Sequence, residues 1–217
     1  ILFIDSDAQV RSKDYIASYL KLTDGNQVIC GGTGNFDSCP SKEKALRYKY
    51  EVHAERKRTL KERRRHPYAQ FTTFNFMIQR ELFMQIRFCN EICDYGHEDS
   101  LFGLELKDRK IPVLHIDNKL IHTGLENTPS YLRKVKTSLF TLSRLDEKVQ
   151  RRVYQETSAI PLVARMGDPV QVHRRRLGRA HHARGDDRHV RGQGFDHIQR
   201  AEVLDVLLGG AGLAGVI

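Results

Sequence analysis

Four apolar residues and two aspartates open the sequence, in the stretch Ile1-Leu2-Phe3-Ile4-Asp5-Ser6-Asp7. The apolar run predicts a short, fully buried strand. In an extended chain, side chains two residues apart point to the same side, so Asp5 and Asp7 should converge just after this strand. Open α/β sheets bind their ligands beyond the carboxyl ends of their strands. The stretch therefore predicts a sheet edge that carries two carboxylates.

Strand and helix patterns alternate over the following residues, which predicts a mixed α/β layer fold. Residues 71–78 alternate in the manner of a half-buried strand. The helix that begins at Thr128 carries Pro129 in its first turn, and its apolar stripe continues to Val149. Further strands are predicted over 27–30, 111–116 and 120–122, and further helices over 14–22, 42–65, 80–86 and 99–110.

Positive charge is concentrated in the helix predicted over 42–65. The chain has 36 Lys and Arg against 27 Asp and Glu, a net charge of +9, and its 40% hydrophobic content excludes membrane-spanning and fibrous proteins. Residues 42–65 hold eleven of the basic residues against four acidic ones, which leaves seven of the nine surplus charges there. Such a helix suits a polyanion, an acidic glycan or an anionic membrane surface. It is also compatible with a solvated helix that buries a narrow stripe, formed by Leu46, Tyr50, His53 and Leu60.

Composition changes near residue 160. All Lys residues lie at or before Lys148, whereas the segment after Leu162 has nine Arg and little hydrophobic periodicity. We expect residues 1–160 to form a partial catalytic domain and residues 161–217 to be a distinct tail, disordered or foreign to the rest. The tail lacks the interleaved aromatic residues of a nucleic-acid stacking surface, so no nucleic-acid partner is expected.

Four cysteines occur without the short spacing of a zinc knuckle, at positions Cys30, Cys39, Cys89 and Cys93. Free, reduced thiols in an intracellular protein are the expectation. The sequence shows no N-terminal signal pattern, and we expect a cytoplasmic location, peripheral at the inner face of the membrane if the basic helix binds lipid. The chain begins without Met on an apolar run, which we interpret as a start inside a domain.

Three groups of residues could carry chemistry. Asp5 and Asp7 would repel each other unless they share a hard divalent cation such as Mg²⁺ or Mn²⁺, although a strand-ending turn is the simpler explanation of an Asp-x-Asp pattern alone. Glu98 and Asp99 open a helix, either as a first-turn cap or with one carboxylate held as a general base. His122 ends a late strand and is better placed as a metal ligand than His115, which lies inside an apolar run.

The order of these motifs resembles family-2 glycosyltransferases of the GT-A fold, over roughly residues 1–145. The most specific stretch is Gly96-His97-Glu98-Asp99 leading into Leu101-Phe102-Gly103. The other matching segments are Asp5-Ser6-Asp7, Phe71-Thr72-Thr73-Phe74-Asn75-Phe76-Met77-Ile78, Arg80-Glu81-Leu82-Phe83 and Ile121-His122. The resemblance implies a GT-A-like mixed sheet flanked by helices. Family members carry an N-terminal nucleotide-binding half before the Asp-x-Asp motif, which this chain lacks, so we expect it to be inactive alone and to show an unpaired sheet edge.

A metal-dependent, inverting transfer of a sugar from a nucleotide-diphosphate donor to a glycan or other hydroxyl acceptor is the activity that the resemblance implies. UDP-sugars are the expected donors, Mn²⁺ or Mg²⁺ the expected cofactor, and polysaccharide biosynthesis the expected process. By position, Asp7 and His122 would bind the metal, Asp5 the ribose or metal, and Asp99 would be the catalytic base. The substrate-binding residues would be Glu98, Thr73 and Asn75.

Two other classes remain compatible with the sequence. The first is a basic module that binds a polyanion or membrane surface without catalysis, in which the acidic residues only cap helices. The second is a metal-dependent nucleotidyltransferase or phosphohydrolase, because paired aspartates serve there too.

Overall fold

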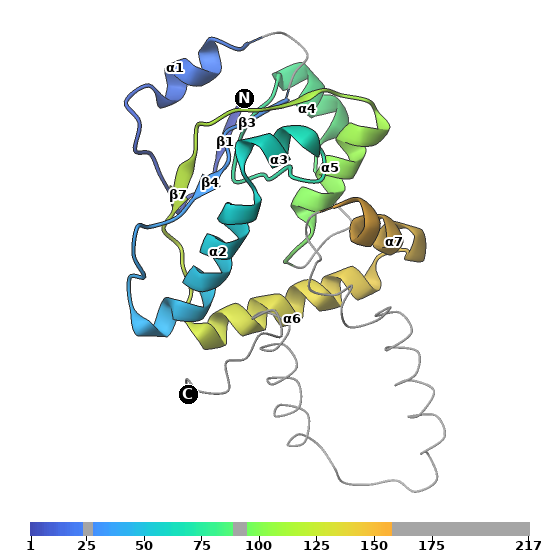
Figure 1. Cartoon of the computed structure of the whole chain (residues 1–217). Coiled ribbons are helices and arrows are strands. Elements are labelled where there is room, and N and C mark those ends of the chain that lie inside the picture. The colour runs from blue at the N-terminus through green and yellow to red at the C-terminus, as the bar shows by residue number, and fades with distance from the viewer. Residues whose placement is uncertain (24–27, 89–94, 158–217) are drawn as a thin grey trace, which may run out of the picture. The chain divides into compact units, whose positions relative to one another are not determined.

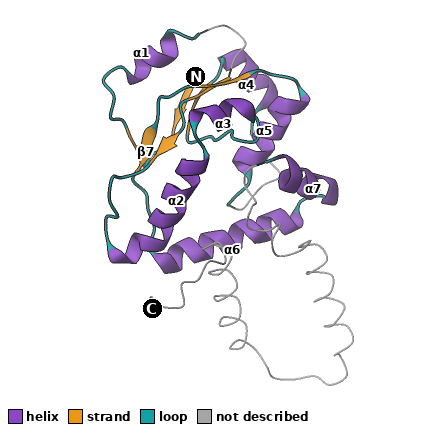
Figure 2. Cartoon of the chain, viewed as in Figure 1, coloured by secondary structure: helices purple, strands orange, loops and turns teal. Residues whose placement is uncertain are grey.

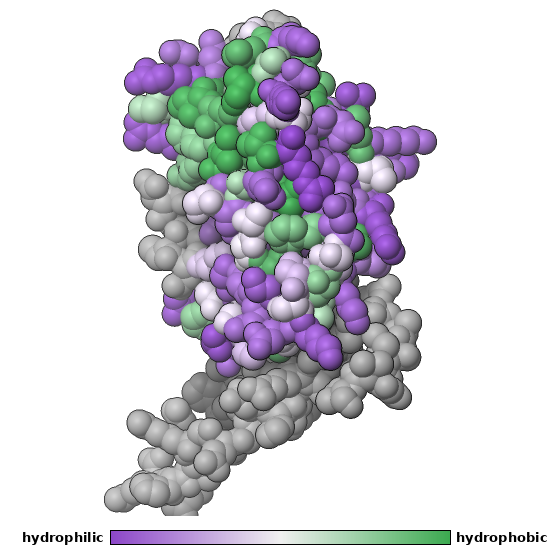
Figure 3. Space-filling view, turned by 90° about the vertical axis from the view of Figure 1, so that its left-hand side faces the viewer, coloured by the Kyte–Doolittle hydropathy of each residue, from purple (hydrophilic) through white to green (hydrophobic). Residues whose placement is uncertain are grey.

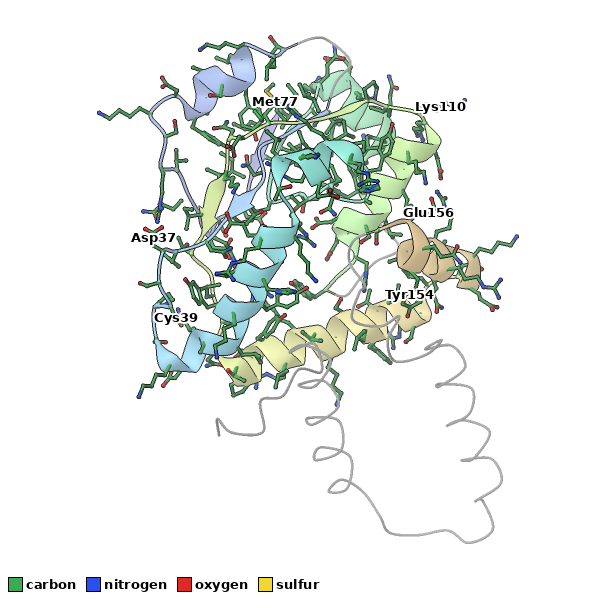
Figure 4. The ribbon with its side chains drawn as sticks, in the orientation of Figure 1. Asp37, Cys39, Met77, Lys110, Tyr154 and Glu156 are labelled. Atoms are coloured by element: carbon green, nitrogen blue, oxygen red, sulfur yellow. The ribbon has the colours of Figure 1, made fainter. Side chains whose placement is uncertain are left out.

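The computed structural model describes residues 1–23, 28–88 and 95–157, which all lie in one compact unit, Ile1–Ala159. It is a mixed α/β structure in which helices surround two small sheets (Figures 1 and 2). The expected tail, residues 161–217, lies outside the described residues, as do Cys89 and Cys93. Cys30 is buried and Cys39 is exposed, and both are free thiols. Figure 4 labels Cys39 in the segment that leads into α2 (Ala45–Lys57).

Sheet A has the order β1-β5-β3-β6, and sheet B has the order β2-β7-β4. In sheet A, β5 is antiparallel to both its neighbours, while β3 and β6 are parallel. In sheet B, β7 is antiparallel to β2 and parallel to β4. The strands of sheet A are β1 (Leu2–Ile4), β3 (Val28–Cys30), β5 (Asn75–Met77) and β6 (Val113–His115), and those of sheet B are β2 (Ala8–Gln9), β4 (Thr33–Gly34) and β7 (Leu120–His122).

Three chain segments pass directly from sheet A to sheet B, namely β1 to β2, β3 to β4 and β6 to β7. The first of these crossings is Asp5-Ser6-Asp7. Ile4 faces Asn75 in sheet A, and Ala8 faces His122 in sheet B. The aspartates therefore lie where the two sheets meet, with the start of β5 on one side and the end of β7 on the other.

Both faces of sheet A are covered by side chains. On β3, Val28 and Cys30 belong to one apolar cluster, together with Phe76 and Phe102, whereas Ile29 belongs to a second cluster. The second cluster contains Tyr15 and Tyr19 of α1 (Tyr15–Leu20), Phe74, Ile116 and Leu120. The half-buried strand predicted over 71–78 is shortened to β5. Phe74, Phe76 and Ile78 are buried, as predicted, and Thr73 and Met77 are partly exposed. Asn75 is the exception, because it is fully buried.

The basic helix is interrupted rather than continuous. It consists of a 3-10 turn (Lys42–Lys44), α2 and α3 (Leu60–Arg65), with a break at Arg58 and Thr59. The Thr59 side chain accepts a hydrogen bond from the Glu62 backbone N–H, which begins a new helix at this point. The narrow apolar stripe predicted for this helix is not fully buried either, since α2 contains no fully buried residue and His53 is exposed.

The remaining helices are α4 (Arg80–Ile86), α5 (Glu98–Asp108), α6 (Thr128–Arg144) and α7 (Glu147–Glu156). The predicted long helix from Thr128 thus ends at Arg144, and Asp146 caps α7 by accepting a hydrogen bond from the Lys148 backbone. Helix α6 lies below the sheets in the view of Figure 1 and contacts α2. Glu156, labelled in Figure 4, binds Lys107 at 2.7 Å and so ties α7 to α5.

Several large apolar side chains near the start of the chain stay at the surface. These are Ile1, Ile4, Val10, Ile16 and Leu20, each at least 42% exposed. Figure 3 shows an apolar area on the upper part of the face that carries this segment. In α1 the buried residues are Tyr15 and Tyr19. The strand that was expected to be fully buried at the start of the chain is not, since β1 contains no fully buried residue. Among the described strands β1 pairs only with β5, so its other edge is unpaired, as expected. None of the described helices combines the length and the hydrophobicity that a membrane crossing requires.

His115 is a core residue, and it makes the fold sensitive to acid. Its Nδ1 lies 3.4 Å from the Arg63 guanidinium and its Nε2 lies 2.9 Å from the Pro67 carbonyl oxygen. Burial and the two neighbouring arginines, Arg63 and Arg64, lower the pKa of His115 to about 4, although its hydrogen bond to Pro67 opposes the shift. An unfolded chain would take up this proton near pH 6.5.

Stability should therefore fall on acidification. Between pH 6.5 and pH 4 the unfolded state binds the His115 proton and the folded state does not, so His115 contributes stability above pH 6.5 that is lost toward pH 4. The loss from this group should be about 3 kcal/mol in the free energy of unfolding. Urea denaturation across this pH range tests it, and His115→Asn, which cannot be protonated, should show a shallower dependence. Equal slopes for both proteins would contradict the prediction.

Candidate active site

His122 links the Asp-x-Asp crossing to the basic helix. Its Nε2 lies 3.2 Å from Oδ2 of Asp7, and its Nδ1 lies 2.8 and 3.0 Å from the two carboxylate oxygens of Glu51 on α2. Burial opposes a charge on His122, but the hydrogen bond to Glu51 and the charges of Glu51 and Asp7 raise its pKa above the ordinary value. The ring also meets Phe74 edge-on, with the centroids 5.6 Å apart. The imidazole is thus contacted by a carboxylate at each nitrogen and by an aromatic ring along one side.

Glu51 is itself held by a cation. Arg47 lies one helical turn earlier on α2 and binds Glu51 at 2.5 Å, and its guanidinium lies over the ring of Tyr131 at the start of α6. Arg47 also approaches Glu126, which binds Lys134 in turn. These contacts join α2 to α6 and fix the helix face from which Glu51 reaches His122.

The Asp7 region is closely packed by the residues that follow His122. Thr123 donates two hydrogen bonds to the Asp7 carbonyl oxygen, from its backbone N–H at 2.8 Å and from its hydroxyl at 2.7 Å. A side chain at Gly124 would meet the Asp7 carboxylate, because a Cβ there would lie 1.9 Å from Oδ2. Glycine at position 124 therefore leaves the space that the Asp7 carboxylate occupies.

Asp5 connects this group with Asp99. Its backbone N–H donates to the Phe74 carbonyl oxygen at 3.2 Å, next to Thr73. Burial raises the pKa of Asp5, the charges of Asp7 and Asp99 raise it further, and His122 opposes them. The charges of three residues that are distant in the sequence thus act on Asp5, which lies where the two sheets meet.

The described residues anchor Asp99 through one of its carboxylate oxygens. Its Oδ1 accepts hydrogen bonds from the Thr73 backbone N–H at 3.0 Å and from the Thr73 hydroxyl at 2.5 Å. Its Oδ2 accepts no hydrogen bond from any described residue. A carboxylate that is fixed in this way keeps a free oxygen for a proton from outside the protein.

The turn before α5 places Asp99 in the first helical turn. Gly96 and His97 both have positive φ, 114° and 73°, and a Cβ on Gly96 would lie 2.5 Å from the Ser138 hydroxyl of α6. His97 also contacts Ser138, with Nε2 3.0 Å from its carbonyl oxygen. Glu98 is exposed and accepts a hydrogen bond from the Gly96 backbone N–H at 3.0 Å, whereas the N-cap residue His97 makes no side-chain capping hydrogen bond. The Glu98 carboxylate therefore makes a structural contact within the turn that precedes α5.

Asn75 does not face the site, contrary to its expected place beside an acceptor. It is fully buried, and its Oδ1 accepts from the hydroxyls of Tyr15 at 2.7 Å and Tyr19 at 2.5 Å. Its Nδ2 donates to the carbonyl oxygens of Gly32 and Asn118, both at 2.9 Å. All four hydrogen-bonding positions of the amide are used within the fold, which leaves none for a substrate.

Among the described residues, two side chains at the junction of the sheets face each other as possible donors to a cation, and a third carboxylate lies beside them. The Asp7 carboxylate and His122 Nε2 face each other, and Asp5 lies nearby. Within the described part of the chain, no three His, Cys, Asp or Glu side chains are grouped tightly enough to hold a metal ion by themselves. Mg²⁺ is commonly bound by one or two carboxylates plus substrate phosphates, so two protein ligands fit an ion that arrives with a diphosphate.

Sequence reasoning found Asp5, Asp7, Asp99 and His122 but missed Glu51. Glu51 was counted only as a charge in a basic helix. The available signal was Arg47 one turn before it, since an i,i+4 ion pair fixes a carboxylate on one helix face. Nothing in the sequence indicated which partner that face would meet.

Comparison with models of known protein families gave no match for this sequence, and a search of curated proteins gave no relative.

Proposed function

We propose that this chain carries the catalytic centre of a metal-dependent, inverting glycosyltransferase with a GT-A-like fold. The observation that carries the proposal is Asp99, which among the described residues is anchored by Thr73 on one oxygen, and whose charge acts on Asp5 together with those of Asp7 and His122. The resemblance of the motif order to family-2 glycosyltransferases supports it. The arrangement combines a carboxylate fit to accept a proton with a pair of groups fit to hold a cation.

Asp7 and His122 would hold Mn²⁺ or Mg²⁺, with Asp5 beside them. When bound, the ion supplies positive charge to the diphosphate that leaves the sugar. The chain's own part is to keep Asp7 in place, through the Thr123 hydrogen bonds and the space at Gly124, and to orient the His122 ring through Glu51 and Phe74.

Asp99 is the proposed general base. Its free oxygen takes the proton of the acceptor hydroxyl while the hydroxyl oxygen forms a bond to the anomeric carbon of the donor sugar. The bond from that carbon to the diphosphate oxygen breaks at the same time, and its electron pair leaves with the nucleoside diphosphate. One displacement from the opposite face inverts the anomeric centre. UDP-sugars are the proposed donors, and a glycan is the proposed acceptor.

Product analysis tests this function. The complete gene product is incubated with Mn²⁺, a glycan panel and, in turn, the UDP derivatives of galactose, N-acetylgalactosamine, glucose and glucuronate. Release of UDP together with a lengthened glycan of inverted anomeric configuration is expected, and chelation by EDTA should abolish both. Donor cleavage without a glycosylated product would instead favour a phosphohydrolase or nucleotidyltransferase.

A second proposed role is binding to an anionic membrane surface through α2 and α3. Most of the basic side chains between residues 42 and 65 are exposed, namely Lys42, Lys49, Arg56, Lys57, Arg58, Lys61, Arg64 and Arg65. Flotation with phosphatidylserine vesicles should show salt-sensitive binding that the paired change Lys57→Glu and Lys61→Glu weakens. Equal binding to neutral vesicles would contradict this role.

Gly124→Ala should displace Asp7 without unfolding the protein. The new methyl group would overlap the Asp7 carboxylate, and that side chain is 42% exposed and so has room to turn outward. We expect a stability loss of less than about 2 kcal/mol, because a flexible side chain yields more easily than backbone. We also expect weaker Mn²⁺ binding in electron paramagnetic resonance (EPR) titrations with UDP present. Gly34→Ala is the matched control, since its Cβ would meet the end of the Ile121 side chain at 3.0 Å and the Lys119 side chain at 3.6 Å, and not the Asp7 carboxylate. Unchanged Mn²⁺ binding in Gly124→Ala would remove Asp7 from the proposed metal site.

A further inference from the structure

We infer that Glu51 is a positioning residue, which keeps the proton of neutral His122 on Nδ1 so that the Nε2 lone pair faces Asp7. The inference rests on the proposed function, because a lone pair on Nε2 matters only if His122 binds a metal there. Glu51 belongs to none of the motifs that carry the resemblance. It comes from the basic helix, which otherwise takes no part in the proposed chemistry.

The contacts of Glu51 are those of a fixed acceptor. Both of its oxygens lie within 3.0 Å of His122 Nδ1, and the two side chains are only 11% and 12% exposed. Arg47 holds Glu51 from the other side at 2.5 Å, with both side chains on α2. A buried carboxylate that already has a cationic partner accepts hydrogen bonds and does not donate them, so the proton between Glu51 and His122 belongs to Nδ1.

This assignment has a consequence for His122. A neutral imidazole has one N–H and one lone pair, so a proton on Nδ1 leaves the lone pair on Nε2, which lies 3.2 Å from Asp7 Oδ2. A free histidine side chain prefers the opposite tautomer, with the proton on Nε2. Carboxylates that hold the second nitrogen of a metal-binding histidine commonly change metal affinity by about 10–100-fold when they are removed.

Two variants separate positioning from folding. Glu51→Ala removes the acceptor, whereas Glu51→Gln keeps a carbonyl oxygen that still accepts from Nδ1. Glu55→Ala is the matched control: Glu55 lies one turn later on α2 and binds Asn35 and Lys119 rather than the proposed site. If Glu51→Ala does not fold, wild type and Glu51→Gln still decide the tautomer.

The tautomer is read from the ¹⁵N chemical shifts of the His122 ring, measured without metal at a pH where the ring is neutral. Wild type, Glu51→Gln and Glu55→Ala should carry the proton on Nδ1, and Glu51→Ala should shift toward Nε2. Mn²⁺ affinity, measured by EPR with UDP present, should fall about 10–100-fold in Glu51→Ala and much less in Glu51→Gln.

The outcomes distinguish the two proposals. A wild-type ring protonated on Nε2 overturns the role of Glu51, even if Mn²⁺ binds. A ring protonated on Nδ1 in a protein that binds no Mn²⁺ even with UDP present supports the contact but overturns the metal-dependent function. Equal Mn²⁺ affinity in wild type and Glu51→Ala overturns the positioning role while the proposed function stands.

Discussion

Replacing Asp99 with asparagine in the complete gene product should lower kcat for sugar transfer by about 10²–10⁴-fold, which is the usual contribution of a positioned acid or base. Asparagine retains an Oδ1 that accepts from the Thr73 backbone and hydroxyl, so the contacts of this position with Thr73 can persist. Its second side-chain atom becomes an amide nitrogen, which cannot take a proton from the acceptor hydroxyl. The change therefore removes the chemistry and keeps the structure.

Glu105→Gln is the control for Asp99→Asn. Glu105 lies on the same helix, pairs with Arg109 and contacts none of the proposed catalytic residues. The control should transfer sugar at the wild-type rate, and Asp99→Asn should keep wild-type Mn²⁺ affinity and vesicle binding. A kcat within a few-fold of wild type for Asp99→Asn would remove Asp99 as the base. Transfer lost together with metal binding would indicate a disturbed site instead.

Hydrophobic patterns in the sequence correctly predicted those helices and strands whose bounds depend on residues close together in the chain. The helix over 80–86 and the strand over 120–122 occur with the predicted bounds, because their hydrophobic patterns and helix-capping positions lie within a few residues. The prediction of one continuous helix over 42–65 was wrong, because Thr59 caps a new helix by accepting a hydrogen bond from the Glu62 N–H. That capping signal is visible in the sequence, but the high helix propensity of the surrounding charged residues outweighed it.

The residues of the candidate site likewise fall into those that local sequence patterns indicated and those that they did not. Asp5, Asp7 and Asp99 were recognisable because each directly adjoins a predicted strand or helix. Glu51 and Gly124 were not, since their importance depends on residues 71 and 117 positions away, His122 and Asp7. These long-range contacts depend on how the two sheets join, and the hydrophobic periodicity of the sequence does not indicate how the sheets join.

Asn75 shows the same limit most clearly. Its position in an alternating segment predicted a polar side chain directed away from the core, yet the side chain is fully buried among Tyr15, Tyr19 and two carbonyl groups. The two tyrosines come from α1, about sixty residues earlier in the chain. A buried amide with four partners holds α1, β5 and the β3–β4 crossing together, and this is a structural role.

Asn75→Ala should accordingly destabilise the protein by about 3–5 kcal/mol, because it leaves two hydroxyls and two carbonyl groups without this partner and each such loss costs about 1–3 kcal/mol. Tyr15→Phe removes one donor to the same amide and should cost only about 1 kcal/mol. Urea denaturation followed by circular dichroism measures both. An Asn75→Ala protein with the wild-type unfolding midpoint but a raised KM for the acceptor would reverse the assignment and return Asn75 to the substrate side.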